Sequence, residues 1–170
     1  ANDACITIAE ALAGSENAFA ARLTQRAREL GLANAVFSNA TGLPDPEHHM
    51  SVRELSILAR HIITSFPDYY KYYSLPEFTW NKITQQNRNP LLKDYPGADG
   101  MKTGYTKEAG YGLVGSAVRD GRRLIMVIAG LKSINDRRQE AQKLLDWGFR
   151  QFKPIDVYVR GDRVGRATVW

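Results

Sequence analysis

The chemistry that this sequence could perform is concentrated in the stretch GADGMKTGYTKEAGYG, residues 97–112. Lys102, Thr103 and Gly104 stand in a row within it. A lysine can stabilise or deprotonate a neighbouring hydroxyl, and a threonine hydroxyl can bind a carboxylate. A glycine leaves room for another backbone to approach a strand edge. The triplet therefore indicates a strand edge that holds a charged peptide end, although a turn that contains a lysine by chance gives the same letters.

The segments on either side of this triplet predict the strands that would position it. Two apolar runs, YGLVGSAV from Tyr111 and RLIMVIAGL from Arg123, flank Asp120 and Gly121. An Asp-Gly pair between apolar runs is typical of a tight hairpin. Upstream, EFTWNKITQQ over residues 77–86 predicts a short, partly exposed strand or hairpin pair.

Helical patterns fill most of the remaining chain. Residues 1–13 and 16–30 form two such patterns, with Ser15 as the N-cap of the second and Gly31 as its stop. After a loop over residues 33–50, Ser51 and Glu54 form a capping box for a helix that ends before Pro67. A last helix is expected over residues 135–152. This order predicts an α+β fold, with helices packed on an antiparallel sheet.

Composition excludes several classes of protein. The chain has 170 residues, 44% hydrophobic and 24% charged, as in folded globular domains. No apolar run is long enough to span a bilayer, and no signal peptide is visible. The net charge of +5 comes from basic residues spread among acidic ones, so nucleic-acid binding is not expected.

The cysteine and the histidines of the sequence are expected to have structural roles and not catalytic or metal-binding ones. Cys5 lies in an apolar helical stretch, which favours a buried structural thiol over a nucleophile. His48, His49 and His61 lack the spacing and the additional ligands of a metal site, so no metal is expected.

A cluster of tyrosines and a pair of opposite charges are the remaining candidates for a binding or structural role. The tyrosines of residues 69–73 could stack on sugars or could pack on the domain. Arg137 and Glu140 on the last helix are expected to form a solvated ion pair.

Lys-Thr-Gly is also one of the three motifs of the serine penicillin-recognising enzymes, in the order Ser-x-x-Lys, Ser-x-Asn, Lys-Thr-Gly. The opening ANDAC resembles the continuation of Ser-x-Asn, with its serine immediately before Ala1. Together with GLANAVFSNATGLPDPEHHMSVREL, QNRNPLL and LLDWGFRQF, the chain resembles the low-molecular-mass D-alanyl-D-alanine carboxypeptidases over nearly all of residues 1–153. No serine of the chain has a lysine three positions later, so the acylated nucleophile is expected to lie outside it.

The resemblance implies the C-terminal portion of a DD-peptidase/β-lactamase-like fold in residues 1–153, without its N-terminal portion. Residues 154–170 resemble a hairpin that opens a β-rich C-terminal domain. The activity implied is removal of the terminal D-alanine from peptidoglycan stem peptides through an acyl-enzyme, outside the cytoplasmic membrane, with no metal or organic cofactor. β-Lactams and the missing N-terminal half, as a second chain or a further segment, are the other expected partners. A β-lactamase-like hydrolase and an inactive lobe that binds wall peptide are the alternatives.

The resemblance also implies a role for each motif residue. Lys102 would be the cation of a shared proton network, and Asn2 would hold the substrate amide or orient the missing serines. The Tyr105 amide would stabilise the oxyanion, and Gly104 would admit the substrate. Thr103 and Arg88 would grip the terminal carboxylate, although Arg88 could equally be a solvated loop residue.

Overall fold

The computed structural model describes residues 2–155 and 157–166 and confirms the α+β class. Two helices, α1 (Asn2–Ala13) and α2 (Glu16–Glu29), open the chain. The Ser15 hydroxyl accepts a hydrogen bond from the Ala18 amide at 3.2 Å, so the predicted N-cap is confirmed. Gly31 follows α2 with a φ of +81°, a conformation that suits the predicted helix stop.

Helix α3 (Val52–Ser65) carries the predicted capping box between Ser51 and Glu54. The Glu54 carboxylate also accepts a hydrogen bond from the Asn34 amide at 2.7 Å, which ties the preceding loop to the helix start. Hydrogen bonds, above all from the Ser51 side chain, lower the pKa of Glu54. Pro67 does not simply end the helix: it opens the short helix α4 (Pro67–Tyr70), which continues into the 3-10 turn η1 (Lys71–Ser74).

The central sheet has three antiparallel strands in the order β3 (Ala98–Thr106), β4 (Gly110–Arg119) and β5 (Arg122–Leu131). Asp120 and Gly121 join β4 to β5 with positive φ values of 51° and 72°, which confirms the predicted tight hairpin. The short strands β1 (Glu77–Trp80) and β2 (Ile83–Gln86) form the second expected hairpin, followed by α5 (Leu91–Asp94).

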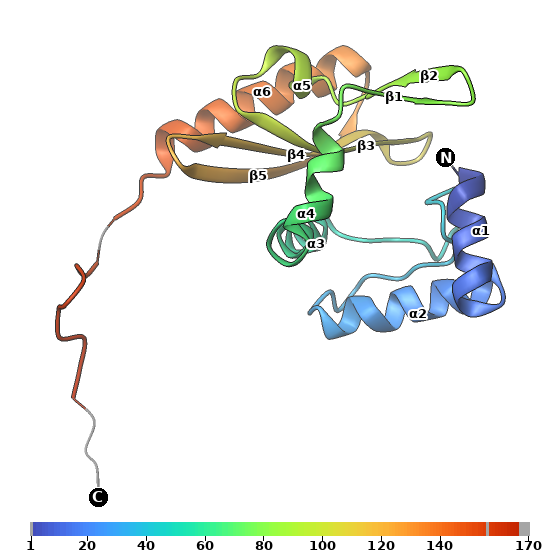
Figure 1. Cartoon of the computed structure of the whole chain (residues 1–170), viewed down its shortest axis with the longest axis horizontal. Coiled ribbons are helices and arrows are strands. Elements are labelled where there is room, and N and C mark those ends of the chain that lie inside the picture. The colour runs from blue at the N-terminus through green and yellow to red at the C-terminus, as the bar shows by residue number, and fades with distance from the viewer. Residues whose placement is uncertain (1, 156, 167–170) are drawn as a thin grey trace, which may run out of the picture.

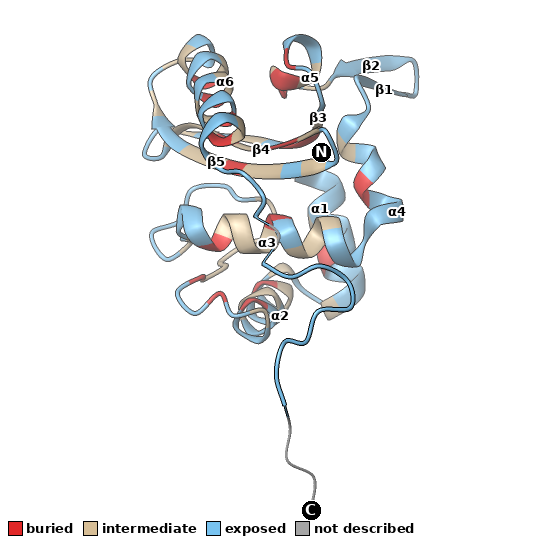
Figure 2. Ribbon diagram, turned by 90° about the vertical axis from the view of Figure 1, so that its left-hand side faces the viewer, coloured by how far each residue is buried: buried red, intermediate tan, exposed pale blue. Residues whose placement is uncertain are grey.

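Helices cover both faces of the central sheet, as Figures 1 and 2 show from two sides. The last helix, α6 (Ile134–Gln151), packs on one face through a core that includes Leu113, Met126 and Leu145. Helix α3 lies across the other face, where Ala59 and Met101 belong to a separate buried cluster. The sheet is therefore held from both sides, and β3 lies at one edge of it.

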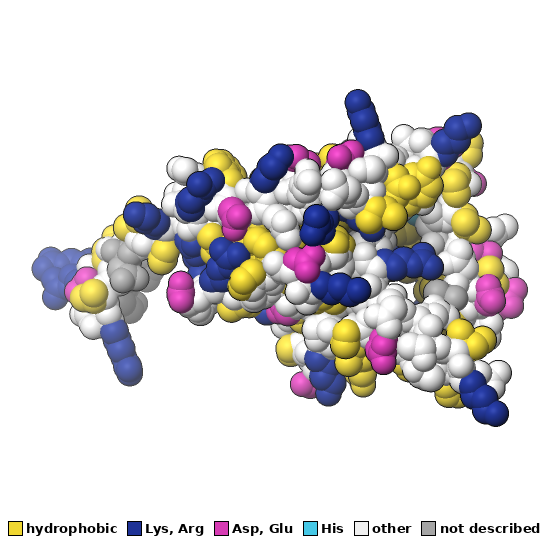
Figure 3. Space-filling view, turned by 90° about the horizontal axis from the view of Figure 1, so that it is seen from above, with side chains coloured by type: hydrophobic (Ala, Val, Ile, Leu, Met, Phe, Trp, Pro, Cys, Tyr) yellow, Lys and Arg dark blue, Asp and Glu magenta, His cyan; other side chains and the backbone are white. Residues whose placement is uncertain are grey.

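The described residues after α6 form turns and irregular backbone, and none of residues 152–155 and 157–166 belongs to a strand. The hairpin expected over residues 154–170 is thus absent from this described part, and the rest of that segment lies outside the described residues. No helix in the described ranges has the length and apolar character needed to cross a membrane. Basic and acidic side chains are interspersed over the face that Figure 3 shows, as the sequence predicts.

Candidate functional site

Strand β3 presents the predicted Lys-Thr-Gly triplet at the open edge of the sheet. The strand pairs with β4 on one side only, with Lys102 opposite Val114 and Gly104 opposite Gly112. Lys102, Thr103 and Gly104 line a cavity of about 350 Å³ whose other walls come mainly from apolar side chains of α3, β4 and β5. The sequence therefore correctly placed the triplet on a strand edge beside a cavity.

The upstream end of β3 is fixed by a network of polar side chains. The Tyr70 hydroxyl donates to Asp99 at 2.9 Å, and Arg123 forms an ion pair with the same carboxylate at 2.7 Å. Arg123 also donates to the hydroxyl of Ser116, which is fully buried. Burial, the largest cause, raises the pKa of Tyr70 to about 12, so its hydroxyl stays protonated as a donor. These contacts join β3, β4, β5 and α4 at Asp99, which precedes Lys102 by three residues.

The ammonium of Lys102 lies in a positively charged, partly desolvated environment. The side chain as a whole is exposed, but its end is surrounded closely enough that burial lowers its pKa. The positive charges of Arg88 and Arg137 lower the pKa further. Its Nζ donates to the Thr103 carbonyl at 2.6 Å. Such an environment favours an anionic ligand, because a carboxylate would relieve the repulsion between the three cations.

Arg88 is placed by two asparagines on either side of it. The Asn87 amide group donates to the carbonyls of Tyr73 and Leu75 at 3.2 and 2.9 Å. The buried Asn89 accepts a hydrogen bond from the Leu91 amide at 3.0 Å. Although Arg88 is exposed, its backbone is fixed and its charge acts on Lys102.

Arg137 was wrongly predicted to form a solvated ion pair with Glu140. The arginine is only 6% exposed, whereas Glu140 pairs with Lys143 at 2.7 Å. Its guanidinium lies 5.6 Å from the ring centroid of Tyr111, and its Nε has no hydrogen-bond partner among the described residues. Burial lowers the pKa of Arg137. Because the charge of this buried cation acts on Lys102, Arg137 is a further candidate residue of the site.

A signal for Arg137 was present in the sequence. The buried positions of α6 are Arg137, Ala141, Leu145 and Gly148, at spacings of one helical turn. An arginine on the apolar stripe of a helix is a candidate for a functional or paired buried charge.

Helix α1 was assigned a buried thiol, and this was also wrong. Cys5 is exposed and lies close enough to Lys102 to influence the pKa of the lysine. The first turn of α1 therefore lies near the lysine, and the β3–β4 end of the sheet reaches toward it in Figure 1. Asn2 begins this turn and is exposed, without a hydrogen bond to Lys102 among the described residues.

The side chains of His48 and His61 make local contacts, His48 in the loop before α3 and His61 near the C-terminal end of that helix. His48 accepts a hydrogen bond from the Ser38 amide at 3.2 Å and packs edge-on against Phe37, with ring centroids 5.5 Å apart. His61 contacts Ser65 at 3.1 Å. Over the part of the chain that the structure describes, no group of three metal-binding side chains comes together.

The sequence comparisons agree with this geometry. A family model described as D-alanyl-D-alanine carboxypeptidase matches residues 1–133. The chain is 42% identical over 170 residues to the D-alanyl-D-alanine carboxypeptidase DacD of Escherichia coli, covering 99% of this chain and 44% of the relative. It is 39% identical over 173 residues to DacF of Bacillus subtilis, with 99% and 44% covered. The chain thus spans about 44% of the length of these relatives.

Solved structures extend the likeness to three dimensions. Penicillin-binding protein 5 from Haemophilus influenzae superposes with a TM-score of 0.85 at 43% identity, over 88% of this chain and 44% of the other. Penicillin-binding protein D2 from Listeria monocytogenes, in its cefotaxime-bound form, gives 0.80 at 31% identity, over 88% and 61%. The edge strand with Lys-Thr-Gly, its cavity and these matches together show that the chain belongs to the D-alanyl-D-alanine carboxypeptidase family.

Proposed function

We propose that this chain supplies the lysine-bearing portion of a serine-type D-Ala-D-Ala carboxypeptidase. The observation that carries the proposal is the edge strand β3, whose Lys102, Thr103 and Gly104 line one cavity with Arg88 and Arg137 nearby. An open strand edge can pair with the extended end of a stem peptide. The surrounding cations suit the carboxylate of its terminal D-alanine.

The reaction would proceed by acyl transfer. A serine attacks the carbonyl between the two D-alanines, D-alanine leaves, and water releases the acyl group. Lys102 would be the cation of the proton network at the serine, and the Tyr105 amide would donate to the developing oxyanion. Thr103, Arg88 and the buried Arg137 would bind the terminal carboxylate, while Asn2 would hold the substrate amide.

The nucleophile would come from a polypeptide portion outside these 170 residues, because no serine here begins a Ser-x-x-Lys motif. The cavity beside β3 supports this, since its walls are largely apolar apart from the triplet. An apolar segment that carries the serine at its end would fill the cavity and bring the hydroxyl to Lys102. The site of action would be peptidoglycan outside the cytoplasmic membrane, with β-lactams as substrate analogues.

A complementation experiment tests this function. The 170-residue chain alone is expected to form no adduct with a fluorescent penicillin and to release no D-alanine from a peptide ending in D-Ala-D-Ala. Addition of the Ser-x-x-Lys-bearing portion of a relative is expected to restore both, and a serine-to-alanine change in that portion should abolish them. Release of D-alanine by the chain alone would contradict the proposal. Rapid turnover of the penicillin would instead favour a β-lactamase-like hydrolase, and restored binding without acylation would favour an inactive lobe.

The substitution Gly104→Ala tests the approach of the substrate along β3 without a change in the stability of the fold. A Cβ at Gly104 meets no atom within 4 Å, so the thermal unfolding midpoint should not change. The added methyl would project from the face of β3 into the space beside the edge along which the stem peptide is proposed to lie, and a displaced substrate reacts roughly 10- to 100-fold more slowly. Acylation rates of the complemented protein measure the effect. Unchanged acylation would show that the substrate does not approach along this edge.

A further inference from the structure

We propose that the β1–β2 hairpin, together with Tyr72 at its base, binds the sugar rings of the saccharide that bears the stem peptide. The inference rests on the proposed function for its choice of saccharide. The binding itself is a property of the hairpin and can be measured without any catalysis.

One face of the hairpin is apolar and uncovered. Phe78 lies opposite Gln85 and Trp80 lies opposite Ile83 in the strand register, so these four side chains share a face. Phe78, Trp80 and Ile83 are 61%, 74% and 62% exposed. Hydrophobic side chains also gather at this end of the molecule in Figure 3. Exposed apolar groups in contiguous patches mark interaction sites.

On the opposite face of the hairpin, the polar side chains form hydrogen bonds with one another. The hydroxyls of Thr79 and Thr84 are hydrogen bonded at 2.8 Å, and Gln86 donates to Glu77 at 2.5 Å. This face therefore gives the hairpin a stabilising cross-strand ladder. Since an isolated two-stranded hairpin is marginally stable, a ligand on the apolar face would also add to its stability.

The base of the hairpin forms a cavity with the chemistry of a saccharide site. Its volume is about 460 Å³. Its lining joins Phe78 and Gln85 of the apolar face to the Glu77–Gln86 pair at the base of the opposite face, and to Tyr72, Leu75 and Asn87. Aromatic rings stack on the C–H faces of sugar rings, and amide and hydroxyl groups bond to sugar hydroxyls. Polar groups placed among aromatic side chains are typical of small-ligand sites.

The charge of this surface favours a neutral ligand over the stem peptide itself. Glu77 is the charged residue among those lining residues, and its carboxylate is engaged by Gln86. A peptide carboxylate would find its cations at Lys102, Arg88 and Arg137 instead. The two surfaces therefore suit two parts of one substrate, a charged peptide end and an uncharged sugar.

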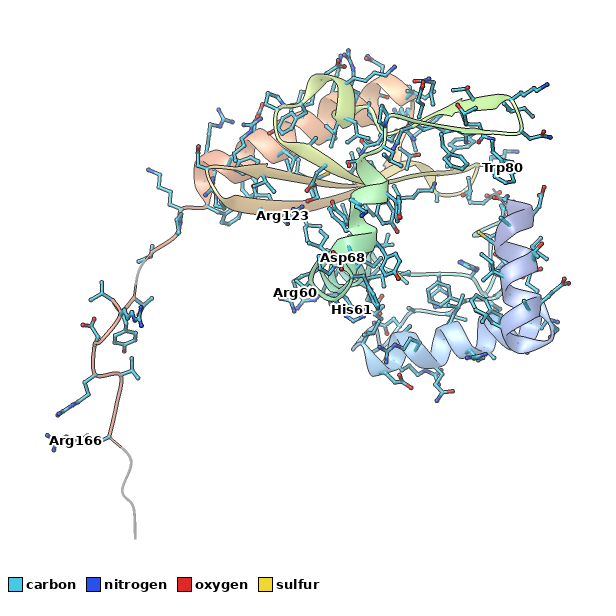
Figure 4. The ribbon with its side chains drawn as sticks, viewed as in Figure 1. Arg60, His61, Asp68, Trp80, Arg123 and Arg166 are labelled. Carbon is cyan, nitrogen blue, oxygen red and sulfur yellow. The ribbon has the colours of Figure 1, made fainter. Side chains whose placement is uncertain are left out.

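The hairpin is also continuous with the candidate site. Trp80 lies at its tip, and Figure 4 shows this side chain on the side of the hairpin that faces the N-terminal end of α1. Arg88 follows β2 two residues after Gln86, and Asn87 fixes the backbone between them. A saccharide on the hairpin would thus be joined to a peptide that extends toward Lys102.

Binding of N-acetylglucosamine tetramer to the full 170-residue chain tests the inference, with calorimetry or NMR titration as the measurement. Trp80→Ala is expected to weaken binding at least about tenfold, because stacking is lost. Trp80→Tyr should retain most of the affinity. Thr84→Ser, on the opposite face, keeps the hydroxyl that bonds to Thr79, so it serves as the matched control and should leave the affinity unchanged.

Failure of the tetramer to bind would overturn the inference, and so would equal binding by Trp80→Ala. Burial of the Trp80 side chain by the complementary Ser-x-x-Lys portion would also overturn it, because the hairpin face would then be an internal contact. Acylation by penicillin in the complemented protein should be unaffected by Trp80→Ala, since penicillin carries no saccharide. The tetramer result thus stands apart from the acylation result, and either proposal can fail without the other.

Discussion

Replacing Lys102 by alanine is expected to lower penicillin acylation of the complemented protein by about 10³-fold, the scale of losing one preorganised charged group at a reaction centre. Lys102 is the lysine among the residues that line this cavity, and the charges of Arg88 and Arg137 also act on it. Rates of adduct formation with a fluorescent penicillin measure the effect. Lys93→Ala on α5 is a matched control that removes a lysine without touching the cavity.

The fold should tolerate the loss of Lys102, because the lysine is held in a desolvated, like-charged environment. Its pKa is lowered, so the folded chain binds fewer protons than the unfolded chain between the lowered pKa and the ordinary value near 10.5. Lys102 therefore costs stability below the lowered pKa, and this cost is relieved as pH rises. Thermal unfolding of Lys102→Ala at neutral pH should give a midpoint no lower than that of the parent. If Lys102→Ala were unfolded, loss of structure would account for the loss of acylation. That result would contradict the placement of Lys102 in a destabilising, desolvated environment.

The pH dependence of acylation should follow the same group. If Lys102 acts as a cation, activity falls as pH rises through its lowered pKa. Arg137→Gln removes one of the charges that lower this pKa, so the alkaline limb should move to higher pH. The position of the limb reports on Lys102 even if the substitution also weakens substrate binding.

Gly97→Ala is expected to destabilise the fold by about 3 kcal/mol, the upper range for a single substitution. Gly97 has a φ of +82°, and an added Cβ would overlap the carbonyl oxygen of Val118. The residue cannot move away, because its own carbonyl accepts a hydrogen bond from the Val118 amide at 2.8 Å. The start of β3 would have to separate from β4, and a loss of this size lowers the thermal midpoint by roughly 6 °C or more.

Gly121→Ala provides the comparison for this substitution. Its φ of +72° carries a similar backbone penalty, but an added Cβ meets no atom within 4 Å. Chemical denaturation of the two variants separates the conformational cost from the steric cost. Equal losses would show that Gly97 is not limited by contact with Val118.

Local sequence signals predicted the frame of the molecule well. Ser15, the Ser51–Glu54 capping box and the Asp120-Gly121 turn act through neighbouring residues, so their outcomes could be read from short stretches. The letters Lys-Thr-Gly alone could equally mark a turn; their position just before the predicted hairpin indicated the strand edge that β3 forms.

The errors concern burial that depends on distant segments. Arg137 is buried because α6 packs near Tyr111 of β4, and this contact cannot be read from the charged neighbours of the arginine. Cys5 is exposed although its helix is apolar, as are Ile8 and Leu12 at 55% and 59%. An apolar helix face predicts burial only when another described segment covers it.

The tight turns of the central sheet have a consequence for how the molecule assembles. The β3–β4 and β4–β5 connections span only residues 107–109 and 120–121, so most contacts in the sheet join segments that follow each other in the chain. Such low contact order favours rapid folding. We therefore expect the strand with Lys102 to pair early in folding, before segments that are distant in the sequence pack against the sheet.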